Sequence, residues 1–210
     1  MGRIIAVPIF IFLMILNVRS VLGHVNGLLP LNTVKTAGFI HDLLLVCFYG
    51  LIIILYFLRR PPRSISTSFV TNTIAILAAI IPFIFPFMGE SGLINPRMIV
   101  IADLTIMAGM VLCIYSLCSL GRSFSIIPQA RKLVQDGPYR LIRHPLYLGE
   151  LVSTFGIVLV DARILKVSLY GLFIGFQIYR AFQEERLLGT VFPEYQEYYT
   201  RTARLVPGLF

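Results

Sequence analysis

Long apolar runs dominate this sequence and restrict how the chain can fold. An α-helix rises about 1.5 Å per residue, so about 20 apolar residues cross a hydrocarbon core of about 30 Å. Six runs approach this length, the first and the last two being short: 4–18, 38–58, 69–88, 98–119, 146–162 and 164–182. We therefore predict an all-α fold, a polytopic membrane helical bundle of about five to six transmembrane helices.

The composition is typical of a membrane protein rather than a soluble one. Hydrophobic residues make up 57% of the chain and charged residues 13%, whereas about a quarter of the residues in a soluble domain are charged. Six spans leave almost no length for a soluble domain among the 210 residues. We expect any binding or catalytic apparatus to be built from helix ends and loops.

Most Lys and Arg residues fall in connections that would share one side of the membrane, and such residues concentrate on the cytoplasmic side. We predict an integral, multi-pass membrane protein with both termini and any active site facing the cytoplasm. The net charge of +8 then reflects this topology and contact with anionic lipid headgroups. It does not require a nucleic-acid partner.

Proline and cysteine positions add two expectations. Pro82 and Pro86 fall inside the third run, where we expect a kink that neighbouring helices accommodate. Cys47, Cys113 and Cys118 fall inside predicted spans without metal-ligand spacing. We expect all three to be small core residues, and we expect no metal.

The segment 137–150, GPYRLIRHPLYLGE, is the most chemically crowded part of the chain. Pro145 suits the first turn of a helix, which places His144 at the electropositive helix mouth. Gly137 begins a turn before it, and Tyr139 reaches back towards the mouth. Gly149 allows either a close helix approach or a ligand wedged against the backbone. The alternative is that these Arg and Tyr residues only anchor the helix at the headgroup level.

A second polar cluster, RAFQEE at 180–185, ends the last apolar run. Arg180 and Glu184 lie one helical turn apart, and the simplest interpretation is an i,i+4 ion pair at an exposed helix end. In so short a hairpin, however, Glu184 and His144 must lie at the same membrane face. A carboxylate and an arginine there suit a sulfonium methyl donor and a carboxylate acceptor.

Together these motifs resemble the isoprenylcysteine carboxyl methyltransferases, most of all their compact prokaryotic members. The likeness rests on Gly-Pro-Tyr, Arg-His-Pro-x-Tyr-x-Gly, Arg-x-x-x-Glu-Glu and a downstream Phe-x-Glu-Tyr-x-x-Tyr. It covers about residues 98–210, and it implies N-terminal transmembrane helices over 1–97 and a methyltransferase core over 98–210. The Arg-His-Pro-x-Tyr-x-Gly pattern alone is shared with sterol reductases.

The resemblance implies S-adenosyl-L-methionine as cofactor, bound in a cytoplasmic pocket of loops and a C-terminal helix. It implies a catalytic, substrate-binding role for Arg180 and gives no role to Glu150. The residues that it assigns to the cofactor are Gln129, Arg131, Lys132, Leu133, Val134, Tyr139, His144, Pro145, Leu146, Tyr147 and Glu184. The residues from Phe192 to Tyr199 themselves indicate an aromatic interfacial helix, which either closes the pocket from below or only anchors the chain at the headgroups.

By the same resemblance, the substrate is the C-terminal carboxylate of an isoprenylcysteine or a similar lipophilic acceptor. A terminal carboxylate with a pKa near about 3.5 is ionised at neutral pH and needs no base. Its prenyl tail would reach the site from the bilayer, and a monomer is compatible with such a site. The alternatives are an NADPH-dependent sterol- or steroid-type reductase, a phospholipid amine methyltransferase and a non-catalytic scaffold.

Overall fold

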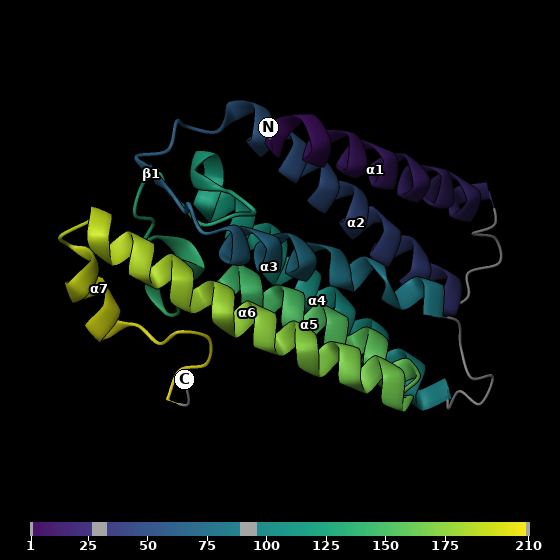
Figure 1. The fold of residues 1–210 in the computed structure, drawn as a ribbon. Helices are drawn as coiled ribbons and strands as arrows, with labels where there is room; N and C mark the ends of the chain where they lie inside the picture. The colour runs from purple at the N-terminus through teal and green to yellow at the C-terminus, as the bar shows by residue number, and fades with distance from the viewer. Residues whose placement is uncertain (1, 27–32, 89–95, 209–210) are drawn as a thin grey trace.

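The computed structural model describes residues 2–26, 33–88 and 96–208 as a bundle of helices (Figure 1). The α-helices are α1 Gly2–Asn26, α2 Thr33–Leu58, α3 Phe69–Ile80, α4 Pro96–Leu120, α5 Pro145–Val160, α6 Ile164–Val191 and α7 Tyr195–Arg201. Short 3₁₀ turns are η1 Ile81–Phe83, η2 Phe85–Met88, η3 Gly121–Ser123 and η4 Gly137–Arg140. Strand β1, Ser64–Ile65, pairs antiparallel with β2, Gln129–Ala130.

The predicted all-α membrane bundle is confirmed. Within the described residues, three segments are long and apolar enough to cross a membrane: Val7–Val25, Gly38–Leu58 and Met98–Ser123. Two shorter apolar helices, Phe69–Phe83 and Pro145–Val160, correspond to two further predicted spans. Figure 1 shows α4, α5 and α6 side by side, with α7, β1 and the C terminus gathered at one end of the bundle.

The structure corrects several helix boundaries. The third predicted run is not one kinked helix, because α3 ends at Ile80 and continues as two 3₁₀ turns. Pro82 and Pro86 each lack an amide hydrogen and displace the preceding turn, so the α-helix breaks there. Helix α1 extends to Asn26, and α6 extends to Val191. The cluster 180–185 therefore lies inside α6 and not at its end. Charged residues can continue a helix beyond the point where the sequence stops being apolar.

The prediction that all three cysteines are core residues is wrong for two of them. Cys113 is buried and its thiol faces the carbonyl oxygen of Leu146 at 3.7 Å. Cys47 and Cys118 lie on exposed helix faces. Helices α2 and α4 are apolar on all sides, so hydropathy cannot separate their inward faces from those that meet lipid.

Helices α4 and α5 approach each other closely along a seam of glycines. A Cβ atom placed on Gly149 would lie 2.7 Å from the Cys113 sulfur and 2.8 Å from the Gly109 carbonyl oxygen. A Cβ atom on Gly156 would lie 2.8 Å from the Ala102 carbonyl oxygen. Small residues permit such backbone contact between membrane helices. The close helix approach predicted at Gly149 is confirmed. The seam holds α5 at a fixed position against α4.

Candidate functional site

Helix α5 begins as the sequence predicts. Pro145 occupies the first turn and His144 is the N-cap residue. The preceding turn η4 begins at Gly137, whose φ of 60° is strained for residues with a side chain. The His144 amide donates to the Arg204 carbonyl oxygen at 3.1 Å. The segment after α7 therefore holds the helix mouth in place.

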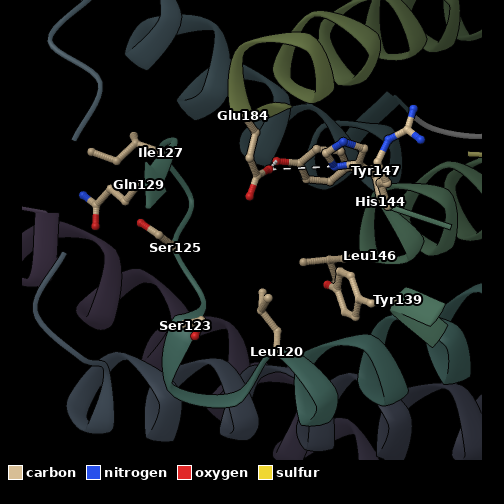
Figure 2. Close-up of a pocket in the computed structure, with 11 residues that line it drawn as sticks. Leu120, Ser123, Ser125, Ile127, Gln129, Tyr139, His144, Leu146, Tyr147 and Glu184 are labelled. Carbon is tan, nitrogen blue, oxygen red and sulfur yellow. Dashed lines mark hydrogen bonds and ion pairs between the residues drawn. The ribbon is translucent and has the colours of Figure 1, made fainter. Parts of the chain in front are cut away.

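His144 and Glu184 meet across the α5–α6 hairpin, as predicted (Figure 2). The Tyr147 hydroxyl donates to Glu184 Oε2 at 2.7 Å, and His144 Nδ1 lies 3.9 Å from the same oxygen. The His144 and Tyr147 rings stack with centroids 5.1 Å apart. Two aromatic rings from the helix mouth thus frame a carboxylate from α6.

The neighbouring Glu185 forms a separate, buried cluster. Its carboxylate accepts from Arg143 Nε at 2.8 Å and from Arg204 Nη2 at 2.9 Å, and it lies 3.2 Å from His144 Nε2. Burial alone would raise the pKa of Glu185, but hydrogen bonds from His144, Arg204 and Arg143 outweigh it and lower the pKa to about 2. This cluster joins the C-terminal segment to α6 and sits behind His144.

A cleft with two overlapping lobes opens in front of Glu184 (Figure 2). The lobes have empty volumes of about 420 and 460 Å³. Both are lined by Leu120, Ser123, Gln129, Tyr139, Arg143, His144 and Glu184. The first lobe adds Ser125, Ile127, Leu146 and Tyr147, and the second adds Lys132, Leu133, Val134, Leu188, Tyr195 and Tyr198.

The cleft brings together most of the residues that the resemblance assigns to the cofactor. Those that line it are Gln129, Lys132, Leu133, Val134, Tyr139, His144, Leu146, Tyr147 and Glu184. Arg131 and Pro145 do not line it. The buried Arg131 side chain is hydrogen-bonded to Gln129 Oε1, and Pro145 is buried at the start of α5.

Arg180 lies on the other side of the Tyr147 ring, outside the lining of the cleft. Its Cζ atom is 4.5 Å from the centre of that ring. Among the described residues its ion-pair partner is Glu150, with Nη1 3.8 Å from Oε2, and not Glu184. The simple i,i+4 pair at an exposed helix end is therefore wrong, because the Arg180 side chain is only 4% exposed.

Two cleft residues outside the predicted cofactor set carry hydroxyl groups without hydrogen-bond partners. Ser125 Oγ and Tyr195 Oη are buried and have no hydrogen-bond partner among the described residues. Buried hydroxyls without protein partners are uncommon, and in a cleft they are free to bond either ordered water or a polar ligand. Nothing in the sequence marks Ser125, whereas Tyr195 belongs to the aromatic helix that was expected to close the pocket. Tyr195 and Tyr198 of α7 do line the second lobe.

The described residues in the first half of the chain support the cleft wall without lining it. The connection after α2 pairs with the segment that carries Gln129, with Ile65 opposite Gln129 and Ser64 opposite Ala130. The Arg63 amide donates to the Ala130 carbonyl oxygen at 2.7 Å. The loop that presents Gln129 is therefore braced by a segment outside the motifs that carry the resemblance.

The described residues contain no group of three His, Cys, Asp or Glu side chains placed to hold a metal ion. The cleft instead offers an aromatic wall, a carboxylate and two hydroxyls without partners. This combination suits an organic ligand that carries both a positive charge and hydrogen-bonding groups.

Residues 98–195 match the family model described as phospholipid methyltransferase. The chain is also 32% identical over 99 residues to the cobalt-zinc-cadmium resistance protein CzcN of Cupriavidus metallidurans, covering 45% of this chain and 46% of that protein. It is 30% identical over 82 residues to the nickel-cobalt-cadmium resistance protein NccN of Alcaligenes xylosoxydans xylosoxydans, covering 39% of this chain and 38% of that protein. The chain thus spans less than half the length of these curated relatives.

The family match confirms the resemblance that the motifs predict, at the level of the superfamily. It covers the cleft residues from Leu120 to Tyr195, including the helix mouth and Glu184. With its three candidate spans the chain is an integral membrane protein. Residues 98–195 are thus similar to the phospholipid methyltransferase family, which lies within the isoprenylcysteine carboxyl methyltransferase-type superfamily of membrane methyltransferases.

Proposed function

We propose that this chain is an S-adenosyl-L-methionine-dependent methyltransferase that binds its donor in the cleft. The observation that carries the proposal is the Glu184 carboxylate, which faces the cleft beside His144 and Tyr147 in a segment matching a methyltransferase family. We also propose that residues 98–210 form the methyltransferase core, with 1–97 as supporting membrane helices.

The residues of the cleft fit this donor. Glu184 would attract its positive charge, and the unpartnered hydroxyls of Ser125 and Tyr195 would bond its polar groups. Tyr139 would pack against the ligand from the turn before α5.

The acceptor that we favour is the carboxylate of an isoprenylcysteine. When bound, the donor supplies a methyl group on a sulfonium centre, which a carboxylate oxygen takes without loss of a proton. Arg180 would orient that carboxylate, Glu184 would hold the donor, and the aromatic walls would exclude water. The chain therefore needs to align and desolvate the reactants rather than supply a base.

A phospholipid amine is the second candidate acceptor. Two observations favour it: the description of the matching family and the Glu150 carboxylate beside Arg180. An ammonium group must lose a proton before it accepts a methyl group, and a nearby carboxylate would assist that loss. Both acceptors are lipophilic, so both would reach the site from the bilayer.

We further propose that the cleft and both termini face the cytoplasm. This orientation is supported by the distribution of Lys and Arg along the sequence, since positive residues concentrate on the cytoplasmic side. The water-soluble donor would then arrive directly from the cytoplasm.

The proposal is tested with purified protein in lipid vesicles and a donor carrying a labelled methyl group. Labelled product should form with a farnesylated cysteine, and formation should fall at least about tenfold in Glu184→Gln, which loses a charged contact. A label found only on aminophospholipid would select the second candidate. Absence of labelled product with both acceptors, together with stabilisation by NADPH, would refute methyl transfer and support a reductase.

A further inference from the structure

Beside Tyr147, the buried Gln177 and Arg180 and the partly buried Glu150 form a polar cluster between α5 and α6. Gln177 donates through Nε2 to Glu150 Oε2 and accepts from Arg180 Nη1 at 2.8 Å through Oε1. Glu150 and Arg180 themselves approach only to 3.8 Å. This distance exceeds that of a hydrogen bond, so the glutamine amide connects the two charges.

The Arg180 guanidinium is buried, and two of its three nitrogens form hydrogen bonds. Nη1 bonds to Gln177, Nη2 donates to the Ile126 carbonyl oxygen at 3.1 Å, and the Tyr147 ring covers one face. Nε is buried and has no hydrogen-bond partner among the described residues. A buried charged donor without a partner is costly. An anionic group brought against Nε would supply the missing partner.

The position of Glu150 differs from that of a carboxylate in an ordinary structural salt bridge. A direct arginine–carboxylate bridge is frequently bidentate and uses both edges of the fork. Here the ion pair is long, at 3.8 Å, and the hydrogen bonds between Glu150 and Arg180 run through Gln177. The Glu150 side chain is 23% exposed. Ionisable residues within membrane helices are costly and generally functional.

We infer that Glu150 is a positioning residue of the acceptor site, an inference that rests on the proposed function. Through Gln177, Glu150 aligns Arg180 so that Nε meets the anionic group of the acceptor. The negative charge of Glu150 also competes with the acceptor's anionic group for the Arg180 guanidinium. Methylation makes the acceptor neutral, and Glu150 then remains as the partner of the buried Arg180, which favours release of the ester.

The test compares Glu150→Gln and Glu150→Asp in steady-state turnover of a farnesylated cysteine, with donor affinity measured by calorimetry. Glu150→Gln keeps an oxygen for Gln177 but removes the competing charge, so KM for the carboxylate acceptor should fall on the order of tenfold. Glu150→Asp keeps the charge but shortens the reach to Gln177. It should leave KM near that of the unaltered protein and lower kcat. Neither variant should change donor affinity.

Glu197→Gln is the matched control, because it removes an exposed carboxylate of α7 paired with Arg201. It should leave KM and kcat unchanged. The inference is overturned if Glu150→Gln leaves KM within twofold or raises it, or if its effect equals that of the control. It is also overturned if only an amine acceptor is methylated and Glu150→Gln abolishes that reaction, since Glu150 would then contact the acceptor directly. Failure of the unaltered protein to bind the donor or turn over refutes the proposed function instead.

Discussion

Replacing Gly109 with alanine tests whether the α4–α5 seam determines the position of the helix mouth. A Cβ atom there would lie 2.3 Å from the Ser153 backbone nitrogen and 2.7 Å from the Gly149 carbonyl oxygen. Ordinary contact begins at 3.4 Å. Because both obstacles are backbone atoms, the helices must separate by about 1 Å, as in an overpacked core.

The cost of this separation exceeds the gain in helix propensity. Overpacking costs about 1–3 kcal/mol, and the rigid backbone contacts favour the upper part of that range. Alanine instead of glycine returns up to about 1 kcal/mol in a helix. The net loss is about 1–2 kcal/mol, which lowers the Tm of a chain of this size by roughly 2–8 °C.

Gly171→Ala provides the matched control, because a Cβ atom on Gly171 of α6 meets nothing within 4 Å. Its Tm should stay unchanged or rise by a few degrees, since only the propensity gain applies. Thermal unfolding in one detergent compares the two variants, and donor binding then shows whether His144 has moved. Equal Tm values for Gly109→Ala and Gly171→Ala would refute the seam argument.

Two further predictions concern the cleft, and a third concerns the Glu185 cluster behind it. Tyr147→Phe removes the 2.7 Å bond to Glu184 but keeps the ring, so donor affinity measured by calorimetry should fall about five- to tenfold; unchanged affinity would exclude this bond from donor binding. Ser125→Ala and Tyr195→Phe remove hydroxyls without partners, so Tm without donor should not fall while donor affinity does; a loss of Tm alone would give these hydroxyls a structural role. The pKa of Glu185 is lowered to about 2 because hydrogen bonds outweigh burial, so its contribution to stability is present above the ordinary value of about 4.3 and is lost as pH falls through about 2. Acid unfolding should steepen in that window, and Glu185→Gln should abolish the steepening; identical acid profiles would contradict the cluster's role.

Much of the fold follows from local patterns that the sequence displays directly. The start of α5 at Pro145 follows from the preference of proline for a first turn, and the close approach at Gly149 follows from its missing side chain. The predicted end of the last run, at residue 182, falls short of the end of α6. The apolar sequence stops at the charged residues near Arg180, but the helix continues to Val191. Hydropathy reports where lipid ends, not where backbone hydrogen bonding ends.

The two sequence motifs predicted one contact that connects them directly, but not the contacts that involve residues outside them. The contact between His144 and Glu184 followed from the short hairpin, whereas the partner of Arg180 did not. Glu150 pairs with Arg180 through a glutamine three residues before the arginine, and this contact depends on how α5 and α6 rotate against each other. Ser125 could not be found either, because a serine in a polar connection carries no signal until its surroundings are known.

Titration of S-adenosyl-L-methionine into the purified protein, followed by calorimetry, tests the central claim most directly. The account predicts saturable binding to the unaltered protein and to the control Glu197→Gln. It predicts affinity weaker by about 10–100-fold for Glu184→Gln, which loses a charged contact. Equal affinity in Glu184→Gln, or binding of NADPH in place of the methyl donor, would contradict a donor site at this cleft.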